Sequence, residues 1–167
     1  MTAFEALFRQ HERLVMTNAY FITGSREEAE EITQDVFVSV WKARQSFNPG
    51  KGKLTTWLHR ITVNKCLERQ RKKKLAVVPS ETVELADGKG SEEVVMNEDE
   101  RARVLSAMGS LDGKHRAVLV LRYFNDLSYE EIAHTMGIPL GTVKSRIYVA
   151  IKMLREQLGI QQGEAST

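Results

Sequence analysis

The chain has 167 residues, of which 42% are hydrophobic and 28% charged, which is enough for one ordinary globular domain or two small ones. Its longest apolar run, residues 117–121, is far shorter than the roughly 20 residues that a membrane-spanning helix needs, and the N-terminus lacks a signal-peptide pattern. One cysteine and four histidines at no ligand spacing predict no disulfide, no metal site and no cofactor, and they fit a reducing cytoplasm. Few prolines and long stretches rich in Ala, Glu, Lys, Leu and Arg predict an all-α protein.

The net charge of +2 is the sum of four blocks of opposite sign. Residues 1–39 carry a net charge of −4 and residues 40–74 carry +10. Residues 75–100 then carry −7, and residues 101–167 carry +3. A strongly basic block beside an acidic one predicts a polyanion-binding surface next to an acidic connector.

Three helices are expected in the first half of the chain. Apolar residues recur at steps of three and four over residues 4–22, which predicts the first helix. Ser25 and Glu28 form a capping box that predicts the start of the second. After a break rich in Pro and Gly, a third helix with a basic end is expected over residues 54–74. Three helices of this kind predict one small domain, residues 1–74.

The periodicity is lost in residues 75–99, where an acidic composition predicts a flexible linker. A second helical domain is expected over residues 100–160, beginning with two short helices at 101–108 and 115–123. Residues 161–167 are expected to form a tail.

The second domain carries the pattern of a helix-turn-helix. Ser128 and Glu131 form a capping box that opens the first of its two helices. Ala133 allows the helices to approach closely, Gly137 supplies a left-handed turn, and Val143 buries the second helix on the first.

The last helix is expected to begin near residue 142 and to run to about residue 158. Its side away from the helix-turn-helix core carries Thr142, Lys144, Ser145, Arg146, Tyr148 and Lys152. Hydrogen-bond donors in this position suit a helix that reads the major groove of DNA. The alternative is a helical hairpin with a solvated basic face.

The basic third helix mixes aromatic, amide and cationic side chains, as surfaces that bind unpaired bases do. Trp57 falls on the apolar stripe, which favours core packing over stacking on a base. Asn64 could pair with the edge of an extruded base, although a solvent-exposed or backbone-bonded amide explains it equally well.

Five motifs resemble those of bacterial extracytoplasmic-function (ECF) sigma factors, in the family's order. In the first domain they are residues 29–41, 47–49 and 54–64, and in the second they are residues 127–133 and 141–146. The resemblance covers about residues 4–73 and 100–158. It implies a transcription initiation factor that binds core RNA polymerase, recognises the −35 and −10 promoter elements, promotes promoter opening, and is held inactive by an anti-sigma protein.

The resemblance also implies three sets of site residues. Those for core polymerase binding are Gln34, Asp35, Phe37 and Trp41. Those for the −10 element are Phe47, Asn48, Lys53, Trp57, Arg60, Asn64 and Lys65. Those for the −35 element are Thr142, Lys144, Ser145, Arg146, Tyr148, Val149 and Lys152. Many relatives carry a basic residue where this chain has Val149, so its −35 sequence cannot be inferred from theirs.

The linker resembles the segment that threads toward the polymerase active centre in the family. Its acidic side chains, Glu81, Glu84, Glu92 and Glu93 among them, would mimic a nucleic acid there.

Two other classes of function compete with the sigma factor. A stand-alone helix-turn-helix regulator would bind duplex DNA without polymerase, but it leaves the motifs of the first domain unexplained. An enzyme is not expected, because the chain has no phosphate-binding Gly loop, no His-Glu-x-x-His motif and no nucleophile motif. For Cys66, simple packing in a helix is favoured over redox sensing.

Overall fold

The computed structural model describes residues 2–75 and 97–159, which contain helices and turns but no strand. The first part holds α1 (Ala3–Thr23), α2 (Arg26–Lys42), a 3₁₀ turn η1 (Pro49–Lys51) and α3 (Leu54–Leu75). The second part holds α4 (Glu98–Gly109), α5 (Gly113–Leu119), a π-helical turn η2 (Val120–Phe124), α6 (Tyr129–Met136) and α7 (Leu140–Leu158). The predicted all-α class is confirmed. The predicted linker glutamates and most of the tail lie outside the described residues.

The turn between α1 and α2 has the capping chemistry of two helix ends. Gly24 closes α1 with a left-handed φ of 73°, a conformation that glycine adopts without steric cost. The Ser25 side chain then caps α2 by accepting a hydrogen bond from the backbone N–H of Glu28. The expected capping box is only half formed, because the Glu28 carboxylate pairs instead with Lys73 of α3.

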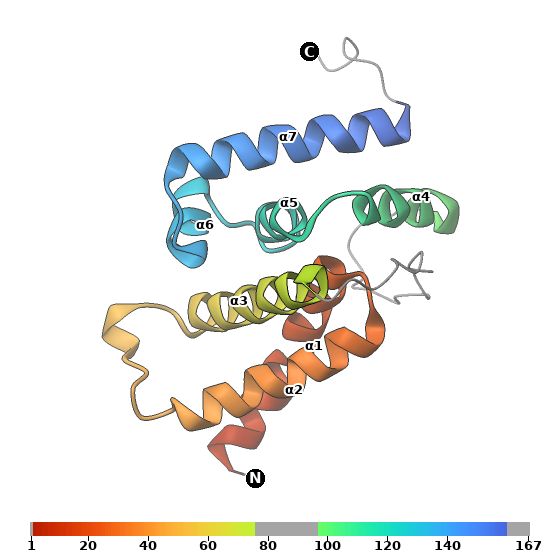
Figure 1. Ribbon diagram of the computed structural model, residues 1–167. Helices are drawn as coiled ribbons and strands as arrows, with labels where there is room; N and C mark the ends of the chain where they lie inside the picture. The colour runs from red at the N-terminus through yellow and green to blue at the C-terminus, as the bar shows by residue number, and fades with distance from the viewer. Residues whose placement is uncertain (1, 76–96, 160–167) are drawn as a thin grey trace.

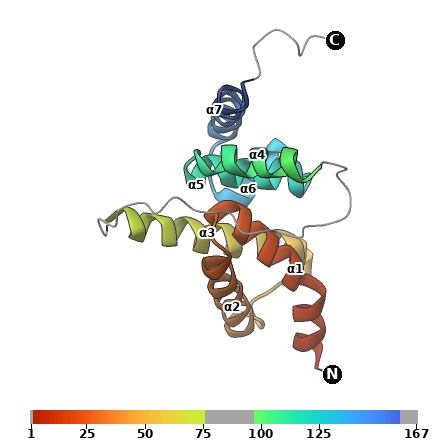
Figure 2. The same cartoon turned by 90° about the vertical axis from the view of Figure 1, so that its right-hand side faces the viewer.

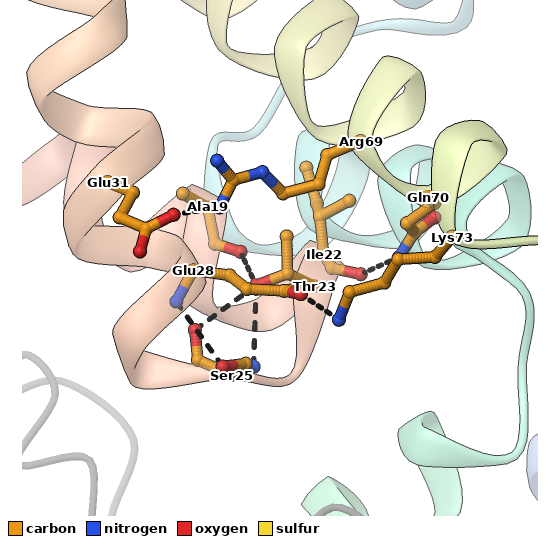
Figure 3. Close-up of polar contacts among 9 residues, drawn as sticks. All are labelled: Ala19, Ile22, Thr23, Ser25, Glu28, Glu31, Arg69, Gln70 and Lys73. Carbon is orange, nitrogen blue, oxygen red and sulfur yellow. Dashed lines mark hydrogen bonds and ion pairs between the residues drawn. The ribbon is translucent and has the colours of Figure 1, made fainter. Parts of the chain in front are cut away.

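The end of α3 is fastened to this turn by polar contacts, as Figure 3 shows. Arg69 pairs with Glu31 of α2. The Gln70 side chain donates a hydrogen bond of 2.9 Å to the backbone carbonyl of Ile22. Two cations of the basic block therefore serve the fold as well as the surface.

The helix-turn-helix forms as its sequence predicts. Ser128 and Glu131 make a complete capping box at the start of α6, and Gly137 ends the helix with a φ of 66°. The last helix begins at Leu140, two residues before its expected start at Thr142, because Pro139 occupies the N-cap position and its carbonyl accepts from the Thr142 N–H.

The buried apolar side chains of both halves form one continuous core. Val15, Val36 and Leu58 of the first three helices belong to the same cluster as Val118 and Ile132 of the second half. Figures 1 and 2 show α4–α7 stacked on α1–α3 in two perpendicular views. Helix α5 packs against α1 and α3, and α6 packs against α3. The sequence predicted two helical units, and the structure adds their direct contact.

Two glycines of the helix-turn-helix should respond in opposite ways to alanine. A Cβ would meet no atom within 4 Å at either Gly137 or Gly141, so backbone conformation alone separates them. Gly137→Ala should lower the free energy of unfolding by about 1 kcal/mol, because its φ is positive. Gly141→Ala should raise it by up to about 1 kcal/mol, since Gly141 lies within α7. Urea unfolding midpoints measure both, and shifts in the same direction would contradict the assignment of the turn.

Candidate nucleic-acid interface

A pocket of about 190 Å³ opens between the turn around η1, the start of α3, and α6. Its lining residues are Ser46, Phe47, Asn48, Lys51, Gly52, Lys53, Thr56, Trp57, Arg60, His134 and Thr135. The rings of Phe47 and Trp57 stack at 5.1 Å between centroids with 21° between their planes. The pocket therefore combines a flat aromatic pair with three cationic side chains, the chemistry that binds an unpaired base and its phosphates.

Five of the seven residues predicted for the −10 element line this pocket, and the other two do not. Asn48 also shapes it, because its side chain accepts a 2.9 Å hydrogen bond from the Gly50 N–H and holds the turn. Trp57 is half-buried, so it both packs and faces the pocket. Asn64 is exposed and Lys65 half-buried further along α3, and neither is among the lining residues.

His59 lies in the basic helix but is buried, with 6% of its surface exposed. Its Nδ1 lies 3.2 Å from the side-chain nitrogen of Asn18, which is itself buried. Burial lowers the pKa of His59, so the neutral imidazole accepts this hydrogen bond. Sequence reasoning missed the pair, although a polar Asn on the apolar stripe of the first helix was a signal for a buried hydrogen bond.

The predicted −35 residues share one side of α7. Val143, Ile147 and Ala150 are buried on the other side and fix the rotation of the helix. Of the candidates, Lys144, Ser145, Tyr148, Val149 and Lys152 are exposed, whereas Thr142 and Arg146 are half-buried. The Ser145 hydroxyl donates to the Gly141 carbonyl at 3.0 Å. The face combines cations, hydroxyls and an exposed tyrosine, which suits phosphates and base edges in the major groove.

The polymerase candidates on α2 divide by burial. Gln34 and Asp35 are exposed. Trp41 is 47% exposed, with its ring edge-to-face on Phe4 and the Arg44 guanidinium 3.8 Å above its centre.

Phe37 is a correction to the predicted polymerase surface. Only 3% of it is exposed, and its ring packs edge-to-face on Phe8 of α1 at 4.7 Å. The helical repeat places it on the buried side of α2, so in this arrangement a partner cannot reach it.

Within residues 2–75 and 97–159, no group of three or more acidic, histidine or cysteine side chains is placed to hold a metal ion. Over the same residues, no helix is long and apolar enough to cross a bilayer.

The fold and its surfaces define a sigma-70-type protein with two helical parts. Residues 7–75 match the Sigma-70 region 2 family, and residues 107–156 match Sigma-70 region 4. The chain is 34% identical to the ECF RNA polymerase sigma factor RpoE of Cereibacter sphaeroides, over 93% of this chain and 86% of that protein. It is 35% identical to SigW of Bacillus subtilis, over 83% of this chain and 80% of that protein. It is also 34% identical to SigE of Mycolicibacterium smegmatis, of which it spans 65%.

Solved structures share the fold. The sigma factor RpoE of Bartonella quintana, in complex with the anti-sigma factor NepR, superposes with a TM-score of 0.76 at 23% identity, over 97% of this chain and all of that one. CnrH, in complex with the cytosolic domain of CnrY, superposes with a TM-score of 0.67 at 27% identity, over 96% of this chain and 90% of that one. The chain belongs to the ECF RNA polymerase sigma factors and is a transcription initiation factor. A stand-alone regulator is not favoured, since region 2 accounts for the first half.

Cys66 should be unreactive in the folded protein. It is fully buried, and burial raises the pKa of its thiol to about 12. At pH 8 only about one molecule in ten thousand would then carry the reactive thiolate. Iodoacetamide should label Cys66 at least about a hundredfold more slowly in buffer than in 6 M guanidinium, as measured by mass spectrometry. Equal rates in the two solutions would show that the thiol is accessible and reopen a redox role.

Proposed function

We propose that this sigma factor docks on core RNA polymerase through the exposed face of α2, captures an unpaired −10 base at the pocket, and reads the −35 element with α7. One observation carries the proposal. Each surface has exposed polar, aromatic or cationic side chains on a segment that matches the family, while the opposite side of the same helix is buried.

The proposed −10 step needs energy to extrude a base, of the order of a few kcal/mol. Lys51, Lys53 and Arg60 line the pocket and can contact the flanking phosphates. A base stacked on the aromatic pair would add about 1–3 kcal/mol. Together these contacts are of the size needed to offset the cost of extrusion.

The proposed division of labour along the chain follows the predicted boundaries. Residues 1–74 bind polymerase and the −10 element, residues 75–99 connect, and residues 100–160 bind the −35 element. The chain itself performs no catalysis and works in the cytoplasm, where the polymerase supplies the chemistry of transcription. Duplex opening is likewise an act of the holoenzyme.

We also propose an anti-sigma partner. The structural relative CnrH is solved in complex with the cytosolic domain of CnrY, and this chain shares its fold over 96% of its length. An anti-sigma protein would have to cover the α2 face or the DNA-reading faces to block initiation.

A pull-down of sigma-free core polymerase, with a housekeeping sigma factor as competitor, tests the proposed function without knowledge of the promoter. Tight and mutually exclusive binding would support it. Failure of the folded chain to bind core polymerase would contradict it.

Reversing the charge of Asp35 should weaken polymerase binding without unfolding the chain. Asp35 is exposed on α2, so Asp35→Arg removes no core contact. An interfacial charge reversal of this kind should raise the Kd for core polymerase by about tenfold or more. The matched control is Glu156→Arg on the exposed side of α7. Competition binding measures both variants, and equal Kd values would remove Asp35 from the proposed surface.

Truncation of Arg146 should impair −35 recognition alone. A lost bidentate contact to a base costs about 1–3 kcal/mol, or roughly 10- to 100-fold in affinity for the promoter. Arg146→Ala should therefore lower transcription from −35-dependent promoters while polymerase binding stays normal. Gln157→Ala, also exposed on α7, is the control. Unchanged promoter binding by the Arg146 variant in gel-shift assays of the holoenzyme would exclude that contact.

A further inference from the structure

The pocket proposed for the −10 base is closed on one side by the second half of the same chain. Its lining includes His134 and Thr135 of α6. Thr135 is 1% exposed, and its hydroxyl has no hydrogen-bond partner among the described residues. Helix α6 therefore stands where an incoming single strand would enter.

The same contact holds the two DNA-reading surfaces too close together. His134 lines the pocket and Thr142 begins the −35 face, so eight residues separate them. Eight residues span at most about 28 Å even when fully extended. Elements at −35 and −10 lie about 25 base pairs apart, which is about 85 Å along B-form DNA. Both elements can be read at once only after the halves separate.

A defined set of contacts joins the halves, and we name it the interdomain latch. Phe21 of α1 stacks on Phe124 at 4.6 Å with 16° between the rings. The Asn125 side chain donates 3.0 Å hydrogen bonds to the Asn18 side-chain oxygen and to the Val120 carbonyl. Because Asn18 also donates to His59, this hydrogen-bond chain runs from the second half into α3.

Gly113 provides the closest approach between the halves. It is buried at the start of α5, and a Cβ there would overlap the Gln70 side chain of α3. Any larger side chain at this position would push α5 away from α3.

We propose that the second half of the chain occupies the −10 pocket in the free protein, and that the interdomain latch must open before the promoter is bound. This inference rests on the proposed function of the pocket. The polar groups of the latch suit a reversible contact, because water can satisfy Asn18 and Asn125 once they separate. Arg116 favours opening as well: its Nε has no partner among the described residues, and burial lowers the pKa of the guanidinium.

Spin labels on the two halves test the latch directly. Cysteines placed at exposed Gln10 of α1 and Glu156 of α7 can be labelled while the buried native thiol stays unreactive. The otherwise unchanged chain should give one short distance between labels. Phe124→Ala should add a longer-distance population, and Tyr123→Ala should not, because Tyr123 is 58% exposed beside it.

A second variant guards against loss of folding. Gly113→Leu should open the same contact by insertion rather than truncation, and circular dichroism should show unchanged helix content in both variants.

Binding of DNA tests whether the latch masks the pocket. The probe is a fluorescein-labelled pool of single-stranded DNA of mixed sequence. Phe124→Ala should bind it about tenfold more tightly than the unmodified chain, because the competent fraction rises. Tyr123→Ala should bind within about twofold of the unmodified chain. Adding Arg60→Ala to Phe124→Ala should remove the gain, since Arg60 lines the pocket.

The two measurements separate the latch from the proposed function. Long label distances in the unmodified free chain, or no opening in either folded variant, would overturn the latch. Opening without any gain in DNA binding would overturn the masking of the pocket. A gain that survives Arg60→Ala would instead contradict the assignment of the pocket, while the distance data would still support the latch.

Discussion

The position of α3 is the constraint on which both candidate promoter surfaces depend. This helix packs against α1 and α2 of its own half and against α5 and α6 of the other. Leu58, Val63 and Cys66 are fully or almost fully buried along it, and these contacts fix its rotation. Arg60 and Asn64 then point outward by helical geometry alone. A helix with few apolar residues thus presents a basic face in a defined direction because its few buried residues are packed on several sides.

The basic block serves two purposes, and the ion pairs show how they are divided. Arg69 and Lys73, toward the C-terminal end of α3, pair with Glu31 and Glu28 of α2. These pairs are partly exposed, so each contributes little stability, but they hold the end of α3 against the α1–α2 turn. Lys51, Lys53 and Arg60 are instead at the pocket, at the other end of the helix. The charge that can act on DNA is therefore smaller than the block's net +10 and is concentrated where the chain turns into α3.

Local signals in the sequence predicted the helices and much of the candidate site. The Ser128 capping box and the left-handed Gly137 are short-range chemistry, and both formed as expected. Helical periodicity also indicated which side of α7 is exposed. It did not place Phe37 correctly, because a wide apolar face leaves its margin undecided between core and surface. The contact of Asn125 with Asn18 joins residues 107 positions apart, and no periodic pattern encodes such a pairing.

The chemistry of the interdomain contact explains how one chain can pack tightly and still separate. Its apolar part alone would favour a permanent association, since buried apolar surface is lost to water on opening. The polar part changes this balance, because hydrogen bonds among amides and an imidazole are exchanged for hydrogen bonds to water at little net cost. A half-buried guanidinium with one unpaired nitrogen gains hydration on opening. An interface of this composition defines a specific closed geometry without making it irreversible, which is what a surface that must later bind DNA requires.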